Sequence, residues 1–418
     1  MTNSKTICNS IDTTKTLGDS PFTIDWLLQS LEANDADFRK DSSNTKVTNI
    51  TTTNIGKGTG FISTVLKVSI HFENQEESYD VVLKVPETHA LLDIMNECNA
   101  TSETHITEHH IAVIHNRECD FYTDFAEHSG FPVAKVYKAV KWDVGKQRGA
   151  LLMKSFIGKA VVLGYEESLN PKQMFNMATY IAHFHKYVLC LPSQQWMGKF
   201  NTDILEWFNE ADFYEGGFEK LKKYKPGVFD EGIETLKTFS NNKKFLRYST
   251  YGVYKDLGLP AVLTHGDMWS NNILWKTESD GSVSNEVAAI LDWQSIHEGC
   301  MTSDLTRILV LCVDGDVRRE YQYQVLQYYY DTLVKLLKKE GITLDVTFEK
   351  IKQAFEANFV VQALAVMIIG SFVFPNQEWT EEEAALNEPK LEKMLARGKC
   401  AMDDALEFFK NLPFDQFE

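Results

Sequence analysis

Cysteines are few in this chain, and they are not grouped. Seven are scattered through 418 residues, and none forms a C-x-x-C pair. Disulfide frameworks and zinc sites need cysteines at paired spacings, so we expect neither. An odd number of scattered thiols is typical of a reducing compartment, which predicts a cytoplasmic protein.

Long apolar segments are also missing. Residues 1–20 hold no apolar stretch of the length found in a signal peptide, so we expect no such leader. The longest apolar run covers residues 359–374, which is short of the roughly 20 residues that cross a bilayer. Because Gln362 interrupts this run and Pro375 ends it, we interpret it as a buried core helix and expect no membrane span.

Basic residues are outnumbered by acidic ones. With 42 Lys and Arg against 59 Asp and Glu, the formal net charge is −17 at pH 7. An acidic surface repels nucleic-acid phosphates and anionic lipid, so neither is an expected partner. A site for a phosphate-bearing ligand would therefore need its own local positive charge.

The residue pattern changes near residue 156. Before it, β-branched and aromatic segments dominate; after it, apolar residues recur at helical spacing. We therefore expect an α+β fold, with a small β-rich unit at 1–156 and a larger, mainly helical unit at 157–418.

Individual elements follow from the same patterns. In the first unit we expect a helix at 21–31 capped by Ser20, a linker around 41–54, a β pattern from Val47 to Val85, and a helix at 107–128. The strands we expect are at 61–72, 79–85, 131–137 and 149–153. In the second unit we expect a hairpin at 272–292 and helices at 171–189, 203–223, 229–247, 304–341, 347–374 and 380–411.

The most informative segment is L-T-H-G-D-M-W-S-N-N-I-L-W at residues 263–275. A polar turn follows it, and an apolar strand then ends at Asp292. If the two strands pair as a hairpin, Asn272 at the start of the first and Asp292 after the second lie at the same end. Asp267 lies on the loop that leads to that end. Two carboxylates and an amide then converge, and Mg²⁺ prefers such oxygen ligands.

The same order of groups occurs in the catalytic core of protein kinases. There an Asp, an Asn five residues later and a strand pair leading to a second Asp hold substrate and metal. Gly266 stands where most protein kinases have Arg, and Trp-Gln follows Asp292 in place of Phe-Gly. A lone H-G-D would suit an inert loop equally well, but the spacing of His265, Asp267, Asn272 and Asp292 together favours catalysis.

These motifs resemble a known family. H-G-D-x-x-x-x-N followed by L-D-W looks like the aminoglycoside phosphotransferase and choline kinase group. The strings L-T-H-G-D-M-W-S-N-N-I-L, A-A-I-L-D-W-Q and S-D-L-T-R-I-L are similar to the CHK kinase-like family, which includes ecdysteroid kinase-like proteins. The start T-L-G-D-S-P-F-T-I-D-W-L-L-Q-S-L and the glycine loop I-G-K-G-T-G-F resemble its nematode-type branch, and the likeness covers roughly residues 17–412.

The resemblance implies a protein kinase-like two-lobed fold that uses ATP and Mg²⁺. It implies that Asp267 is the catalytic base, which deprotonates the substrate hydroxyl, and that Asn272 and Asp292 are the Mg²⁺ ligands. His265 would brace the loop, and Asp304 would hold it from the next helix.

A glycine loop is predicted on the nucleotide side. Gly56, Gly58 and Gly60 lie between two β segments, and glycines let backbone amides approach phosphate closely. The loop lacks the G-K-[S/T] and following helix of a Walker A motif. A glycine lid over ATP is the functional interpretation, and a plain hairpin turn is the alternative.

A buried ion pair is predicted beside this loop. Lys84, in V-V-L-K-V, resembles the V-A-I-K lysine of kinases. Glu118 falls within the apolar stripe of the helix at 107–128, where an acid needs a partner. A Lys84–Glu118 pair explains both placements and would direct Lys84 towards ATP phosphates. An edge-strand lysine and a stripe-edge acid are the alternatives.

The resemblance places the connection between the lobes at Met153–Phe156. Related sequences often carry Met-Glu there, whereas this chain has Lys154. Backbone groups of Met153 and Phe156 would still contact adenine, and the lysine leaves the side-chain contacts open.

A small-molecule alcohol is the expected acceptor. Only 11 residues separate Asp292 from Asp304, too few for a protein-kinase activation segment, and no A-P-E motif follows. An aromatic lining could hold a cationic alcohol such as choline, and an apolar one a sterol or another lipophilic alcohol. The candidate aromatics, which could equally be core residues, are Trp196, Trp207, Phe208, Phe213, Tyr214, Trp269, Tyr321, Tyr323, Tyr328 and Tyr329.

A second class of function stays open at this level. A pseudokinase that binds nucleotide or ligand without catalysis would carry the same motifs. The sequence leaves the oligomeric state undetermined.

Overall fold

The computed structural model describes residues 11–56, 62–88, 107–201, 210–374 and 379–412. The chain divides into two compact units. The first comprises Met1–Glu97, His105–Phe125 and Ala134–Ile157, and the second Cys98–Thr104, Ala126–Val133 and Gly158–Glu418. The junction between Ile157 and Gly158 lies one residue beyond the predicted one.

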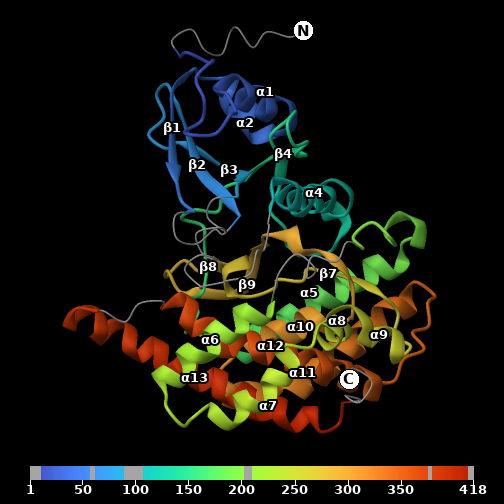
Figure 1. Ribbon diagram of the computed structural model, residues 1–418. Helices are drawn as coiled ribbons and strands as arrows, with labels where there is room; N and C mark the ends of the chain where they lie inside the picture. The colour runs from blue at the N-terminus through green and yellow to red at the C-terminus, as the bar shows by residue number, and fades with distance from the viewer. Residues whose placement is uncertain (1–10, 57–61, 89–106, 202–209, 375–378, 413–418) are drawn as a thin grey trace. The chain divides into compact units, whose positions relative to one another are not determined.

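The first unit is built on a five-stranded antiparallel sheet (Figure 1). Its strand order is β1-β2-β3-β5-β4, from β1 Val47–Asn54, β2 Ser63–Phe72, β3 Tyr79–Pro86, β5 Ala150–Lys154 and β4 Val136–Val140. Within the described residues, helices α1 Ile24–Asn34, α2 Ala36–Ser42 and α4 Glu108–Asp124 accompany it. Alternating sheet residues such as Val68 and Ile70 share one buried apolar core with Leu27 and Phe38 of the first two helices.

The β pattern expected from Val47 begins where β1 begins, and the expected linker extends too far, because residues 47–54 pair with β2. Two other predictions for this unit were wrong in their bounds. The first helix begins at Ile24 behind a Thr23 cap, not behind Ser20. The strand predicted at 131–137 begins only at Val136, since Pro132 cannot donate to a ladder and Gly130 turns at φ 73°.

The second unit is mainly helical. Its helices are α5 Pro171–Cys190, α6 Glu210–Tyr224, α7 Asp230–Ser240, α8 Lys243–Arg247, α9 Val253–Asp256, α10 Ser303–Leu311, α11 Gly315–Lys339, α12 Phe348–Val373 and α13 Glu381–Phe409. Its strands are β6 Ala160–Val161, β7 Val262–Thr264, β8 Ile273–Thr277, β9 Val283–Ile290 and β10 His297–Gly299. The predicted α+β class, a β-rich N-terminal part before a mainly helical one, is confirmed.

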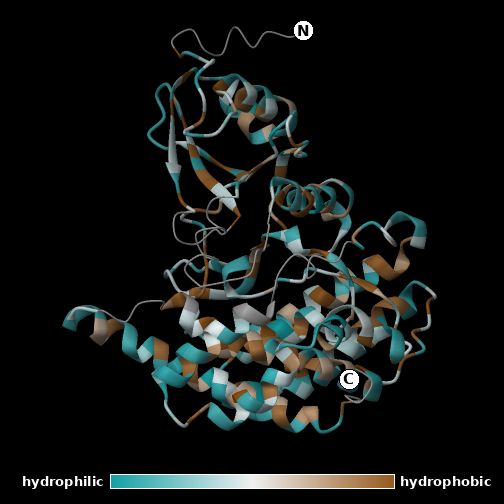
Figure 2. Ribbon diagram, viewed as in Figure 1, coloured by the Kyte–Doolittle hydropathy of each residue, from teal (hydrophilic) through white to brown (hydrophobic). Residues whose placement is uncertain are grey.

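Helix α12 is the apolar segment singled out from the sequence. Residues Phe348–Ser371 are long and apolar enough to cross a membrane by composition alone, the one such helix in the part of the chain described here. In the structure, 72% of its most apolar window is buried inside the protein. It packs against α6, α10 and α13, as a core helix does. Figure 2 shows the contrast with α13, in which polar and apolar residues are mixed.

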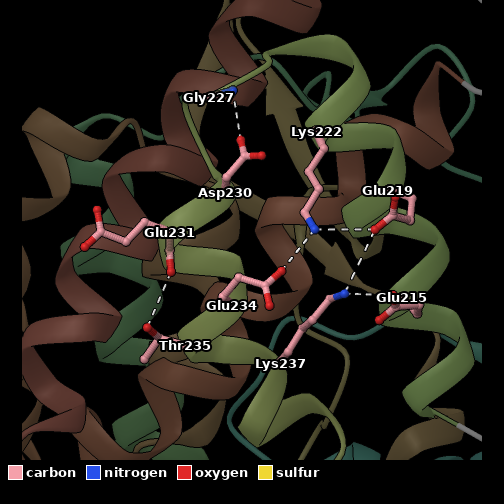
Figure 3. A network of polar contacts seen from close by, with 9 residues as sticks. All are labelled: Glu215, Glu219, Lys222, Gly227, Asp230, Glu231, Glu234, Thr235 and Lys237. Atoms are coloured by element: carbon pink, nitrogen blue, oxygen red, sulfur yellow. Dashed lines mark hydrogen bonds and ion pairs between the residues drawn. The ribbon is translucent and has the colours of Figure 1, made fainter.

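Ion pairs join α6 to α7 at the surface (Figure 3). Lys222 reaches Glu234 at 3.1 Å, and Lys237 reaches Glu215 at 2.8 Å. Both lysines also approach Glu219. Exposed pairs contribute only about 0–1 kcal/mol each, so this network fixes how the two helices are aligned rather than how stable they are.

The single helix predicted at 304–341 is in fact two, α10 and α11. Leu311 ends α10, and the chain turns before Gly315 opens α11. A Cβ at Gly315 would lie 2.4 Å from Cβ of Cys400, so only glycine permits this approach of α11 to α13.

Arg397 of α13 stabilises this break from within. Its guanidinium, 3% exposed as a residue, donates to the Leu311 carbonyl at 2.8 Å, to the Tyr165 carbonyl at 2.8 Å and to Asp314 at 2.8 Å. Those carbonyls lie at a helix end and in a loop, where no helical N–H can reach them. The arginine thereby joins three separate segments.

Replacing Arg397 by Met tests this role. The carbonyls of Leu311 and Tyr165 lose their donor, and the half-buried Asp314 carboxylate keeps only Lys393 at 3.0 Å. The free energy of unfolding should therefore fall by about 1–3 kcal/mol. Urea unfolding measures it, with Lys399→Met on the same helix as control. Lys399 pairs with Asp403 at the surface, with 34% of its side chain exposed, and its loss should change stability by less than about 0.5 kcal/mol. Equal effects of the two variants would contradict this account.

Candidate active site

The loop after β7 is held by a buried carboxylate. Asp304, the second residue of α10, accepts hydrogen bonds from the backbone N–H groups of His265 at 2.7 Å and Gly266 at 2.9 Å. Asp304 is 1% exposed, and burial raises the pKa of its carboxyl. The scaffold role expected for Asp304 therefore has a definite geometry: it fixes two successive amides of the loop.

His265 braces the loop through both ring nitrogens. Its Nε2 donates to the Leu291 carbonyl at 2.8 Å, and its Nδ1 accepts from the backbone N–H of Asp267 at 3.1 Å. Accepting an amide hydrogen requires an unprotonated Nδ1, so the ring is neutral. Burial lowers the pKa of His265, which agrees with the neutral form. The ring also contacts Trp293, with centroids 4.6 Å apart.

Glycine is required at position 266. The backbone there has φ 82°, a left-handed conformation that L side chains rarely adopt. An added Cβ would lie 2.5 Å from the Ser295 carbonyl oxygen. This explains why the Arg of most protein kinases has no equivalent in this loop.

Asp267 is held on both carboxylate oxygens. Oδ2 accepts from Asn272 Nδ2 at 3.1 Å, and Oδ1 accepts from Arg307 Nη2 at 2.6 Å. Burial raises the pKa of the Asp267 carboxyl; Arg307 opposes that rise, and the negative charge of Asp292 adds to it.

The hairpin brings Asn272 and Asp292 together as predicted. Ile273 of β8 pairs with Ile290 of β9, and the Leu291 N–H donates to the Asn272 carbonyl at 2.9 Å. Asp292 follows directly and has φ 61° and ψ 57°. A non-glycine residue in this conformation costs about 1–3 kcal/mol, a strain that is typical of functional sites.

These groups suit a hard divalent cation. Asn272 turns its Nδ2 inward, to the Asp267 carbonyl at 2.8 Å as well as to its carboxylate, which leaves Oδ1 as the atom that can face an ion. Asp292 supplies a carboxylate at the same hairpin end. One carboxylate and one amide oxygen match the sparse protein ligation that Mg²⁺ accepts when phosphates complete its shell.

The predicted ion pair is present in the first unit. Lys84 Nζ lies 2.8 Å from Glu118 Oε2, and the two residues are 7% and 1% exposed. Lys84 lies directly opposite Val65 in the sheet, and Gly56 lies against Val65, where a Cβ would be 3.2 Å away. The start of the glycine loop is therefore beside the lysine strand. Gly58 and Gly60 lie outside the described residues.

The predicted connection between the units lies at the end of β5. Met153 is buried and pairs with Val82, two positions before Lys84. Phe156 follows the strand and is half-buried, whereas Lys154 is exposed. The structure brings Met153 into the lysine sheet, and its backbone and that of Phe156 remain predicted contacts for adenine.

Sequence reasoning assigned no role to Arg307. It lies three residues after Asp304, one turn along α10, which places both side chains toward the same loop. Its Nη1 also donates to Gln362 of α12 at 2.9 Å. The i, i+3 spacing from a predicted loop-holding acid is the signal that could have identified it.

Three of the ten predicted aromatic residues are core: Trp196, Tyr214 and Tyr329 are buried. Tyr321, Tyr323 and Trp269 are half-buried and Tyr328 is exposed, whereas Trp207 and Phe208 lie outside the described residues. Trp269 is the one that follows Asp267 closely in the loop, and its ring contacts Tyr165 at 5.1 Å. A small hollow there, with no interior room for a water molecule, is lined by Tyr165, Trp269, Ser270, Leu311, Val366, Ile369, Met394 and Arg397.

Gly266→Ala should destabilise the protein and displace the loop. Both the positive φ and the contact with Ser295 disfavour alanine at this position. From backbone strain alone, we expect the free energy of unfolding to fall by about 1–3 kcal/mol. Gly281→Ala is the matched control, because Gly281 has φ 86° but nothing within 4 Å of an added Cβ. Thermal unfolding should show a larger loss at 266 than at 281. Equal losses would mean that the steric contact at position 266 is unimportant.

Solved structures show distant likeness to this fold. A Ralstonia eutropha protein proposed to be an aminoglycoside phosphotransferase is 14% identical, with a TM-score of 0.45 over 91% of this chain and 98% of that one. APH(2″)-IIIa in complex with GDP and kanamycin is 12% identical, with a TM-score of 0.42 over 87% of this chain and 97% of that one. At these scores the likeness does not extend to function.

Two Caenorhabditis elegans proteins are relatives in sequence. "Uncharacterized oxidoreductase dhs-27" is 27% identical over 369 residues, which are 85% of this chain and 43% of that protein. "Uncharacterized kinase-like protein D1044.1" is 23% identical over 290 residues, which are 67% of this chain and 70% of that protein. The chain therefore spans less than half the length of the first relative.

The family assignment rests on a match over most of the chain. Residues 37–412 match the DUF1679 family, which carries the description "Uncharacterized oxidoreductase dhs-27". Together with the kinase-like relative, this confirms the prediction of a nematode-type, kinase-like family. The chain belongs to the DUF1679 family.

Proposed function

We propose that this protein is an ATP-dependent phosphotransferase that transfers the γ-phosphate to a hydroxyl group of a small molecule. The observation that carries the proposal is the arrangement around Asp267. A carboxylate with a raised pKa is oriented by a neutral histidine and an amide, and a second acid lies at the same hairpin end. This combination supplies a base and metal ligands together.

The chemical step assigns one action to Asp267. It accepts a hydrogen bond from the acceptor hydroxyl and takes its proton as the hydroxyl oxygen attacks the γ-phosphorus. The bond from that phosphorus to the β–γ bridging oxygen breaks, and ADP leaves. Raising the pKa of Asp267 makes it a better proton acceptor near neutral pH than an ordinary aspartate.

The remaining residues bind and orient. Asn272 and Asp292 would hold Mg²⁺, which when bound would neutralise charge on the phosphates. Lys84, fixed by Glu118, would contact ATP phosphates, and backbone amides of the glycine loop would do the same. In an acidic chain, these are the local positive groups that a nucleotide needs.

The oxidoreductase name of one relative finds no counterpart in the described strands. A Rossmann dinucleotide fold needs a parallel sheet with helical crossovers. Here the paired strands run antiparallel throughout the described residues, and the one parallel contact is an isolated bridge between Val133 and Ile290. A phosphotransferase therefore fits this chain better.

Asp267→Asn tests the proposed base. ADP release from Mg-ATP, measured with a metabolite extract as the source of acceptor, should fall about a hundredfold to ten-thousandfold. Nucleotide binding should persist, because Lys84 and Glu118 are unchanged. Asp280→Asn is the control, since Asp280 lies exposed in the turn of the same hairpin and bonds only to Ser282.

The outcomes separate the two classes of function. If wild type turns over ATP and Asp267→Asn does so equally, Asp267 is not the base. If wild type binds Mg-ATP without turnover, the protein is a pseudokinase. If it binds no Mg-ATP at all, a ligand-binding module without nucleotide is favoured.

The pH dependence of turnover follows from the raised pKa of Asp267. The base works only when deprotonated, so turnover should fall as pH drops through a pKa above the ordinary aspartate value of about 3.9. Arg307 lowers this pKa in the free enzyme, so Arg307→Gln should move the acid limb of kcat/KM to higher pH. If the acid limb of the variant had an unchanged or a lower midpoint pH, the assignment of Asp267 as the base would be contradicted.

A further inference from the structure

Asp267 has two distinct sides. Oδ2 faces Asn272, which lies with Asp292 at the hairpin end and would hold the metal. Oδ1 faces Arg307, which comes from α10 and is tied to α12 through Gln362. Oδ2 therefore faces the proposed metal and phosphate site, and Oδ1 is the oxygen that would face the acceptor.

Arg307 lies where the acceptor hydroxyl must be. A general base needs its proton donor at about 2.6–3.2 Å, and Arg307 Nη2 is 2.6 Å from Oδ1. The guanidinium must leave this position, or share it, before a hydroxyl can approach. The structure thus represents a resting state in which Arg307 masks the base.

Moving the Arg307 guanidinium away from Asp267 separates a positive charge from its counter-ion. The Arg307 side chain is 19% exposed, and guanidinium stays protonated in proteins. A mostly buried cation that loses its carboxylate partner pays a large desolvation penalty unless another anion replaces it. A neutral acceptor offers no replacement, and a cationic one adds a second positive charge.

Part of the guanidinium is ready for such an anion. Arg307 Nε is buried and has no hydrogen-bond partner among the described residues. Nε and Nη2 form one edge of the guanidinium, and a carboxylate or phosphate binds such an edge with two parallel hydrogen bonds. Asp267 uses only Nη2 of that edge.

An apolar wall continues beyond the arginine. Leu311 is one turn further along α10 from Arg307, and Val366 is one turn further along α12 from Gln362. Both line the hollow beside Trp269, two residues after Asp267. A ligand whose charged group met Arg307 would therefore have apolar side chains one turn away on both helices.

We propose that Arg307 recognises a negatively charged group on the acceptor, and that the acceptor is a lipophilic alcohol with an anionic group close to its hydroxyl. This rests on the proposed phosphotransferase function and specifies its substrate class. It favours an anionic lipophilic acceptor over a choline-like cation and over a neutral sterol.

The experiment compares three ligands of equal chain length: a long-chain α-hydroxy acid, the corresponding vicinal diol and the corresponding β-amino alcohol. Equilibrium binding to the full chain is measured by calorimetry. The hydroxy acid should bind at least about tenfold more tightly than the diol, and the amino alcohol most weakly, a difference of about 1.4 kcal/mol per tenfold. Because no phosphate is transferred, this test is independent of turnover.

Variants identify the residue responsible. Arg307→Gln should abolish the preference for the hydroxy acid, and Arg307→Lys should retain part of it, because the charge remains but the two-pronged edge is lost. Arg319→Gln removes an exposed arginine of α11 that pairs with Asp404, and should leave the order of binding unchanged. Thermal unfolding checks that each variant is folded.

A final binding measurement distinguishes two possible partners of Arg307, an anionic group on the acceptor and the γ-phosphate of ATP. If Arg307 instead serves the γ-phosphate, Arg307→Gln weakens binding of a non-hydrolysable ATP analogue, leaves ADP binding unchanged and does not alter the order of the three ligands. That result overturns the proposal. So do equal binding of the three ligands, a preference that survives Arg307→Gln, and no binding of the hydroxy acid. Loss of turnover in the wild type with the preference intact would instead count against the proposed function alone.

Discussion

The carboxylate of Asp304 holds two successive amides of the catalytic loop, and the remaining geometry of the site depends on that contact. With His265 and Gly266 fixed, the loop can turn at φ 82° without a side chain at position 266. The turn directs the histidine ring to Leu291 and to the Asp267 amide. The buried Asp304 thus orients Asp267, the proposed base, without touching it.

The hairpin is the second fixed component. Its register makes Asn272 and Leu291 neighbours, which places Asp292 beside them in a strained conformation. Because β8 and β9 are short and tied to the loop by hydrogen bonds, the three oxygen-bearing residues are positioned before any ligand binds. Such preorganisation is what phosphoryl transfer requires, since the protein contributes orientation and charge rather than covalent chemistry.

Sequence patterns predicted what depends on local spacing. The hairpin, the loop acid and the Lys84–Glu118 pair follow from strand alternation and from polar residues that needed a partner. Sequence patterns failed where contacts between residues far apart in the chain determine where an element ends or what a side chain contacts. The break between α10 and α11 was missed, and there Arg397, 86 residues away, donates to the carbonyl of Leu311 at the end of α10. Arg307 was missed because its partner on α12 lies 55 residues away in sequence.

The two sides of Asp267 connect structure to function. The metal side fits the proposed phosphotransferase, and the arginine side is where we propose that the acceptor is selected. A resting salt bridge that masks the base would limit wasteful transfer of phosphate to water, since Asp267 becomes available only when a suitable acceptor draws Arg307 away.

The most direct measurement of the central claim follows the phosphate itself. The wild-type chain is incubated with γ-labelled ATP and a metabolite extract, and labelled products are separated and identified by mass spectrometry. The account predicts label in a small organic alcohol of negative charge, and no such product with a chain that lacks the Asp267 carboxylate. Label found only in inorganic phosphate or in protein would contradict it.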